Sequence, residues 1–170
     1  MSIDVALSTS SHAARHHIPN PKSPMRIISL NGRPQCGKTH TLLALCDMLA
    51  KSAATLDEVT INQDKRMIFD MHGVIIAVCT GGDNKEIIQE NIAYFDLHHA
   101  AFAVTANRSK AAPKWTLEGY AHDNDHALNE IVMPYANFLK SAAWTQVQHF
   151  VAEYIYEMVM KYVGEERIEA

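Results

Sequence analysis

The sequence predicts a three-layer α/β/α domain whose mostly parallel sheet contains one antiparallel hairpin strand. Short β-prone apolar runs alternate with amphipathic helical segments along the chain. A glycine-rich loop separates the first of these runs from the first helix. The chain has 170 residues, 48% of them hydrophobic, which is the size and apolar content of one domain with its own core.

Composition limits the partners and the compartment. The net charge is -4, from 15 basic and 19 acidic residues, so it predicts no attraction to nucleic acid or anionic lipid. The longest apolar run, Val74–Cys79, is far shorter than the roughly 20 residues that span a bilayer. Three cysteines are an odd number in a chain too large to need disulfides. We therefore expect a soluble, cytoplasmic protein without a membrane segment.

Residues 1–24 are expected to form a flexible N-terminal arm. They lack hydrophobic periodicity and contain Pro19, Pro21 and Pro24. They also lack the apolar segment of a secretory signal. Residues 25–170 are expected to fold as a single domain that ends in helices.

The first half of the domain is expected to contain a strand, a helix and an antiparallel hairpin. Residues 26–31 form a β-prone run that Gly32 ends, and a helix follows from about Gly37. Residues 51–64 are polar and irregular, with room for one short strand at 59–61. Two further strands, at 66–71 and 74–80, are joined by His72-Gly73, a connection typical of an antiparallel hairpin.

The second half is expected to be mainly helical. Asp83 and Asn84 can cap a helix that reaches about residue 98, and residues 101–105 form a buried strand. After a basic loop, a helix at about 123–140 contains Pro134, which would kink it. Before a stop at Gly164, the last helix carries an apolar stripe of Trp144, Val147, Val151, Tyr154, Met158 and Tyr162.

This last helix is also expected to mediate a homodimer. Its opposite side carries Phe150, Ile155 and Val159, which is more apolar surface than one packed face uses. A helix that is apolar over so much of its circumference tends to meet a partner. The sequence therefore predicts a two-fold dimer with this helix in the interface.

The glycine-rich loop, residues 32–39, matches the pattern GxxxxGK[ST] at every fixed position. Its glycines let successive N–H groups surround a phosphate at the positive end of the following helix. Lys38 would reach the β- and γ-phosphates as part of the catalytic machinery, and the Thr39 hydroxyl would bind Mg²⁺. The predicted nucleotide-binding residues are Gly32, Arg33, Pro34, Gln35, Cys36, Gly37, Lys38, Thr39 and His40.

With this motif the sequence resembles the P-loop NTPase superfamily, through residues 26–50 and, by pattern only, through 66–107. The order of its elements is similar to that of small GTPase-like domains. The resemblance implies a P-loop NTPase-like domain that binds a nucleoside triphosphate with Mg²⁺. Where small GTPases have a DxxG motif, this chain has Thr80-Gly81-Gly82-Asp83, which matches neither DxxG nor a Walker B acid.

Two residues are therefore candidates for the acidic residue of the site. Asp83 is the first candidate to hold Mg²⁺ through water or to orient an attacking water. The same residue can also cap the following helix. Asp70 is the second candidate, although its place near the hairpin turn puts it far from the glycine-rich loop.

Nucleotide identity is weakly encoded. ATP is expected because the guanine-reading NKxD motif is absent, and GTP stays an alternative. Asn107 and Arg108 follow the last predicted strand, at the sheet edge where α/β proteins bind ligands. We expect Asn107 to contact the base and Arg108 to contact a phosphate as a catalytic arginine, with a plain loop as the alternative for both.

Three functions are compatible with these residues. The first is Mg²⁺-dependent binding and hydrolysis of ATP, with the Gly-Gly-Asp loop as a nucleotide-gated switch. The second is a small kinase that transfers the γ-phosphate to a nucleotide or another metabolite, with Arg66, Arg108 and Lys110 near the acceptor phosphate. The third is a non-catalytic, nucleotide-dependent interaction module whose C-terminal helix meets a partner.

Overall fold

The computed structural model describes residues 24–134 and 141–169. The predicted N-terminal arm, residues 1–24, lies outside these residues except for Pro24. In the described part the chain forms six strands and four helices. In order they are β1 (Arg26–Asn31), α1 (Lys38–Ala50), β2 (Ala54–Ile61), β3 (Asp64–Met71), β4 (Val74–Cys79), α2 (Lys85–Leu97), β5 (Phe102–Asn107), α3 (Ala112–Asp123), β6 (Ala127–Val132) and α4 (Ser141–Glu169).

The strands form one sheet in the order β2-β3-β4-β5-β1-β6. β1 pairs in parallel with β5 and β6, and β4 pairs in parallel with β5. β3 runs antiparallel to both of its neighbours, β2 and β4. The prediction of a mostly parallel sheet with an antiparallel hairpin strand is confirmed.

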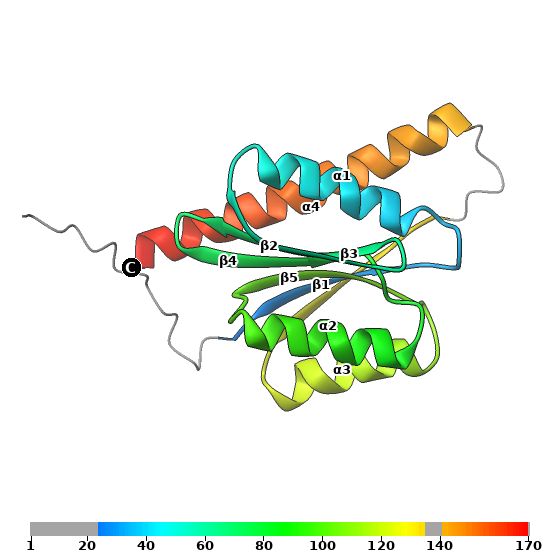
Figure 1. Ribbon diagram of the computed structural model, residues 1–170, viewed down its shortest axis with the longest axis horizontal. Helices are drawn as coiled ribbons and strands as arrows, with labels where there is room; N and C mark the ends of the chain where they lie inside the picture. The colour runs from blue at the N-terminus through cyan, green and yellow to red at the C-terminus, as the bar shows by residue number, and fades with distance from the viewer. Residues whose placement is uncertain (1–23, 135–140, 170) are drawn as a thin grey trace, which may run out of the picture.

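Helices cover both faces of this sheet (Figure 1). α1 and α4 lie on one face, and α2 and α3 lie on the other. Neighbouring residues of a strand therefore face different layers: Ile28 packs in the core under α1 and α4, and Ile27 packs in the core under α2 and α3. Because both faces are covered, the inner strands are mainly apolar, as is usual for parallel strands, although Ser29 and Asn31 of β1 and Thr105 and Asn107 of β5 are buried polar residues.

The edge strand β2 is longer than the sequence predicted. Residues 54–61 form a full strand, although only 59–61 were expected. Every residue of β2 except Asp57 is exposed, and the strand pairs only with β3. A strand that buries neither face lacks the alternation that identifies strands in a sequence.

The helix predicted at about 123–140 is wrong for residues 124–134. α3 ends at Asp123, and residues 127–132 form the edge strand β6, parallel to β1. Leu128 and Ile131 are three residues apart, which is also the spacing of a helical pair. In the strand this odd spacing places the two side chains on different faces of the sheet, where each packs against a core. α3 begins at Ala112, which shortens the predicted basic loop. Residues 135–140 lie outside the described part.

α4 packs a wider face against the core than the sequence predicted. Of the predicted stripe, Tyr162 is buried, and Trp144, Val151 and Met158 are half-buried against the core. The helix continues through Gly164 to Glu169. Ile155 and Val159, expected on the outer side, are fully buried, whereas Tyr154 of the predicted stripe is 59% exposed. The helix has apolar residues at helical spacing on more than one side, so the periodicity alone did not identify the buried face. Its core residues are Ala152, Ile155, Val159, Tyr162 and Val163.

The helices and the cysteines can be compared with the expectations from composition. No helix within residues 24–134 and 141–169 combines the length and the apolarity that crossing a membrane requires. The three cysteines are free and buried. Burial raises the pKa of the Cys46 thiol to about 12 and also raises the pKa of Cys79, which keeps both thiols protonated and unreactive.

Candidate functional site

The loops that follow the parallel strands meet at one edge of the sheet, where a cavity of about 620 Å³ opens. We call it the main cavity. Four segments line it, together with Ala106 of β5: the glycine-rich loop with the start of α1, the 62–64 turn between β2 and β3, residues 80–83 after β4, and the first turns of α4. The carboxyl ends of parallel strands are where α/β proteins bind ligands.

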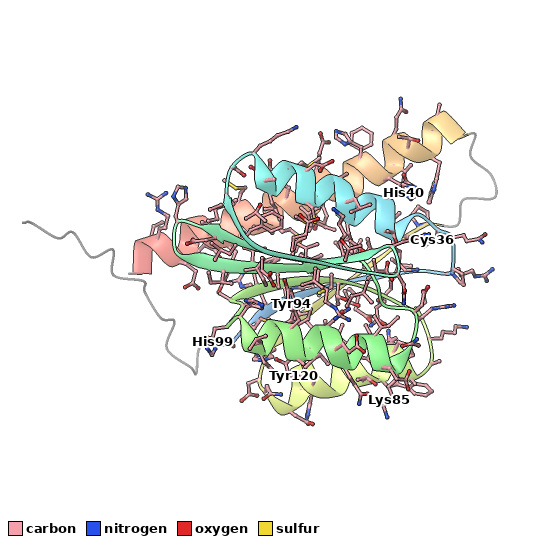
Figure 2. All side chains as sticks on the ribbon, in the orientation of Figure 1. Cys36, His40, Lys85, Tyr94, His99 and Tyr120 are labelled. Carbon is pink, nitrogen blue, oxygen red and sulfur yellow. The ribbon has the colours of Figure 1, made fainter. Side chains whose placement is uncertain are left out.

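The structure brings most of the predicted nucleotide-binding residues to this cavity. Gly32 and Arg33 do not line it but border a smaller cavity of about 120 Å³. Pro34 is exposed beside the main cavity without lining it. Figure 2 labels Cys36 and His40 at this end of the molecule. The predicted residues that line the main cavity are Gln35, Cys36, Gly37, Lys38, Thr39 and His40.

The Lys38 ammonium lies inside the glycine-rich loop. Its Nζ donates to the carbonyl oxygens of Gly32 at 3.1 Å and Arg33 at 2.9 Å. Only 7% of the residue is exposed, and no carboxylate among the described residues pairs with it. A buried cation without a countercharge is costly, and an anion bound beside it would lower that cost.

Gly37 satisfies two requirements at the start of α1. Its φ of 81° lies in the left-handed region that favours glycine. A side chain at this position would also overlap Gln148 of α4. The glycine therefore allows both the turn into α1 and the close approach of α4.

Asp83 lines the main cavity, and its side chain is 60% exposed. Nε of Arg108 lies 3.1 Å from its Oδ1, an ion pair without the alignment of a hydrogen bond. Asn84, and not Asp83, caps α2: its Oδ1 accepts a hydrogen bond from the N–H of Ile87 at 2.8 Å. The Asp83 carboxylate is thus left for the cavity and for Arg108, which itself does not line the cavity.

Two other predicted candidates do not line the main cavity. Nδ2 of Asn107 donates to the Ser29 hydroxyl at 3.3 Å, and its Oδ1 accepts from the N–H of Arg108 at 2.8 Å. The Asn107 side chain is buried in these contacts. Asp70 lies near the opposite end of β3, where its Oδ1 accepts from the N–H of Gly73 in the hairpin turn.

Asp64 is a cavity residue that the sequence reasoning missed. It begins β3, and because β3 is antiparallel this residue lies at the edge where the parallel strands end. The Thr80 hydroxyl lies 3.4 Å from Oδ1 of Asp64, to which it donates. The signal was present in the hairpin: counting back from the His72-Gly73 turn places Asp64 opposite Gly81.

The surroundings of Asp64 raise the pKa of its carboxyl. The main cause is burial, and the neighbouring Asp83 charge raises the pKa further, against the lowering effect of the Thr80 hydrogen bond. A carboxyl with a raised pKa accepts a proton more readily at neutral pH than an exposed one.

The loop that carries Asp83 is fixed from two sides. Nδ2 of Asn91 in α2 donates to the Gly81 carbonyl at 2.8 Å and to the Thr105 hydroxyl at 3.0 Å. A Cβ on Gly82 would overlap the Ala106 carbonyl of β5. Gly82 therefore permits close packing of the loop against β5, and a Cβ on Gly81 would overlap the Asp64 carboxylate at the start of β3.

No protein-family model, curated protein or solved structure matches this chain. The chemistry of the main cavity therefore rests on the groups that line it. These are a buried ammonium, the N–H groups of a glycine-rich loop, a threonine hydroxyl and two carboxylates. Together they can bind a polyanion and a divalent cation.

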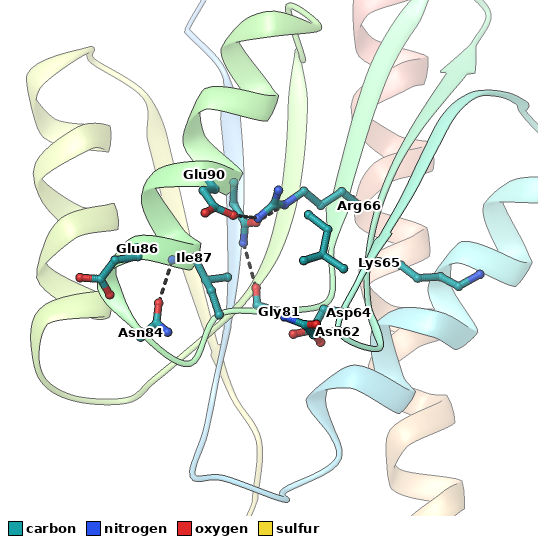
Figure 3. Close-up of a pocket in the computed structure, with 11 residues that line it drawn as sticks. Asn62, Asp64, Lys65, Arg66, Gly81, Asn84, Glu86, Ile87 and Glu90 are labelled. Carbon is teal, nitrogen blue, oxygen red and sulfur yellow. Dashed lines mark hydrogen bonds and ion pairs between the residues drawn. The ribbon is translucent and has the colours of Figure 1, made fainter.

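A second cavity of about 290 Å³ adjoins the main cavity (Figure 3). The two share Asn62, Asp64 and Gly81 as lining residues. Arg66 borders the second cavity, but its Nε donates to Oδ1 of Asn91 at 2.9 Å and its other end pairs with Glu90. Lys65 points away from the cavity in Figure 3 and pairs with Glu58 on β2. Both cations at this cavity are therefore already paired.

Proposed function

We propose that the protein binds a nucleoside triphosphate, ATP in the first place, and hydrolyses it in the main cavity. The observation that carries this proposal is the Lys38 ammonium, buried inside the glycine-rich loop with carbonyl partners and with no carboxylate partner in residues 24–134 and 141–169. A phosphate chain in the loop would supply the missing negative charge. The N–H groups of the loop and the N-terminal end of α1 would favour the same anion.

The resemblance to P-loop NTPases belongs to the same proposal. The GxxxxGK[ST] pattern indicates a phosphate-binding loop only where it lies between a strand and a helix. The order β1, glycine-rich loop, α1 supplies that context. In the sheet, β5 lies between β1 and β4. The loop that carries Asp83 therefore follows β4, which is not the strand next to β1.

Thr39 and Asp83 are the residues that would hold Mg²⁺. Both line the main cavity, and hydroxyl and carboxylate oxygens are ligands that this ion prefers. No three acidic, histidine or cysteine side chains converge within the described residues. Phosphate and water oxygens would therefore complete the coordination, as is usual for Mg²⁺ bound with nucleotides. When bound, the ion would neutralise part of the phosphate charge.

Asp64 is the residue we assign to the attacking water. The water oxygen bonds to the γ-phosphorus while the bond from that phosphorus to the β–γ bridging oxygen breaks. ADP leaves with the electron pair of the broken bond, and the proton of the water passes to Asp64. The raised pKa of Asp64 and its place in the cavity wall support this role.

Phosphate release tests the reaction. We expect release from ATP that requires Mg²⁺, and loss of this activity in Lys38→Ala. Lys161→Ala is the matched control, because it removes an exposed cation of α4 whose one ion-pair partner among the described residues is Glu165. Equal turnover in Lys38→Ala and the wild type would contradict the proposal. Competition by GTP in the same assay measures the preference for ATP, which rests on the absent NKxD motif alone.

Transfer of the γ-phosphate to a small molecule is a second candidate function, and the second cavity favours it. Asp64 lies in the wall that both cavities share, so it could serve an acceptor hydroxyl as well as water. Arg66 is already paired there, whereas Glu86 has no ion-pair partner among the described residues. The cavity therefore suits an uncharged or cationic acceptor better than a nucleoside monophosphate.

Acceptor dependence separates the two functions. ADP formation is measured with a panel of polyols and amino alcohols, and with nucleoside monophosphates as the anionic contrast. A phosphorylated polyol or amino alcohol would establish transfer. Phosphate release that no acceptor changes would establish hydrolysis.

A further inference from the structure

The first turns of α4 form one wall of the main cavity. Trp144 and Gln148 line it, although they lie far along the chain from the glycine-rich loop. A Cβ on Gly37 would overlap Nε2 of Gln148 and would lie 3.1 Å from Nε1 of Trp144. α4 is held in this place because it packs along α1 on the same face of the sheet (Figure 1). Two side-chain nitrogens of α4 therefore lie against the last glycine of the loop.

Both nitrogens are hydrogen-bond donors. The indole N–H of Trp144 can only donate, and Nε2 of Gln148 also donates. Neither group makes a hydrogen bond with a described residue. Both side chains are half-buried, so they are held beside the cavity and not extended into solvent. Donors in this position are matched by an acceptor on a ligand.

We propose that Trp144 and Gln148 bind phosphoryl oxygens of the nucleotide in the main cavity. This inference rests on the proposed function, because phosphate in the glycine-rich loop is the anion that the two donors would meet. Lys38 and the loop would hold the phosphates from one side, and α4 would hold them from the other. Hydrogen bonds to charged oxygens are stronger than those between neutral groups. Neither residue belongs to GxxxxGK[ST], so the binding site extends beyond the motif.

Inorganic tripolyphosphate is the probe that identifies the contacted part of the nucleotide. It carries phosphoryl oxygens and no base, whereas a base stacked on the Trp144 ring would contribute only to ATP binding. The magnesium complexes of both ligands are titrated by calorimetry into the wild type and three variants. The variants are Gln148→Ala, Trp144→Phe and, as the matched control, Gln146→Ala on the exposed side of the same helix.

We expect Gln148→Ala and Trp144→Phe each to weaken both ligands by about tenfold, the effect of one hydrogen bond to a charged oxygen. Gln146→Ala is expected to bind like the wild type. Trp144→Phe removes the N–H and keeps an aromatic ring in the cavity wall. Thermal unfolding checks that each variant folds. Gln148→Ala carries the test by itself if the tryptophan variant does not fold.

Fluorescence supplies a second readout. The chain has two tryptophans, and Trp115 is exposed on α3, away from the main cavity. In Trp115→Phe the emission of Trp144 alone is recorded. We expect tripolyphosphate to change that emission and to reduce its quenching by acrylamide, because the ligand would cover the indole.

The outcomes separate the possible contacts. Variants that lose affinity for ATP but not for tripolyphosphate would mean contact with the base, which overturns the assignment to phosphoryl oxygens. Wild-type affinity of both variants for both ligands would show that α4 is no part of the site, while the nucleotide site itself stands. A wild-type protein that binds neither ligand would overturn the proposed function and this inference with it.

Discussion

In the proposed function, Lys38 would hold the phosphate chain and Thr39 would hold its metal ion. The ammonium of Lys38 is enclosed by the carbonyl groups of its own loop, while Thr39 is half-buried beside it and lines the main cavity. An unpaired buried cation costs stability in the free protein. Features that cost stability persist in proteins where function requires them.

Thr39→Ala is predicted to remove the effect of Mg²⁺ on nucleotide binding. The variant lacks the hydroxyl that would bind the ion, but it keeps Lys38 and the N–H groups of the loop. Calorimetric titration with ATP is run with Mg²⁺ and with chelator for the variant and the wild type. Wild-type binding that is indifferent to Mg²⁺ would show that Thr39 has no such role.

The three acids considered for the site are predicted to behave differently. Asp64→Asn is expected to lower turnover about a hundredfold or more, the usual contribution of a general base, with little change in affinity. Asp83→Asn is expected to lower turnover more than binding, because a metal ligand acts mostly in the transition state. Asp70→Asn is the control, since its carboxylate binds the distant hairpin turn. Wild-type turnover in Asp64→Asn would refute the assignment.

Asp64→Asn is also predicted to stabilise the fold at neutral pH. Burial raises the pKa of Asp64 above its ordinary value of 3.8, so the folded state favours the protonated form. The stability that this protonation contributes is complete below pH 3.8 and is lost as the pH rises through the raised pKa. Asparagine does not ionise and avoids that loss. The melting temperatures of variant and wild type should therefore differ at neutral pH and converge in acid; an unchanged difference across this range would contradict the pKa direction.

At the scale of elements, the loop after β4 should depend on Gly82. Gly82→Ala is predicted to cost about 1–3 kcal/mol, because its Cβ would overlap the Ala106 carbonyl. Gly119→Ala in α3 is the matched control: a Cβ there meets nothing within 4 Å, and alanine is the better helix former by about 1 kcal/mol. Urea unfolding should shift the two midpoints in opposite directions. A Gly82→Ala protein as stable as the wild type would mean that the loop is not packed as described.

The sequence predicted best the elements that bury a face. β4 is a continuous apolar run, β1 and β5 are mainly apolar and buried, and the hairpin was found from its two-residue turn. β2 and β6 are edge strands with few buried residues, so they carry no clear alternation. Asp64 was missed for a related reason: its position depends on pairing between β3 and β4, which no local pattern around residue 64 encodes.

At the scale of the whole molecule, layer arrangement was predictable and strand order was not. Apolar strands that alternate with helices require cover on both faces, which fixes three layers. Whether β4 or β5 lies beside β1 depends on packing between distant segments. The same limitation hid the position of α4 at the main cavity, since nothing near Trp144 or Gln148 in the sequence indicates the glycine-rich loop.

The outer side of α4 is the place for the predicted dimer. Phe150 is 68% and Tyr154 59% exposed, and their spacing of four puts them on one side of the helix. We expect light scattering at micromolar concentration to give twice the 19.0 kDa of one chain. Phe150→Ser with Tyr154→Ser should return a monomer, and Leu97→Ser, at an exposed leucine of α2, should not. A monomer mass throughout a dilution series of the wild type would end this prediction.

The central claim is that the Lys38 ammonium is a phosphate-binding group, and its most direct test is calorimetric titration with MgATP. The wild type and the Lys161→Ala control should bind with equal affinity. Lys38→Ala should bind about a hundredfold more weakly, since it loses a charged hydrogen bond from a buried ammonium. An affinity for MgATP that is the same in Lys38→Ala as in the wild type would contradict the claim.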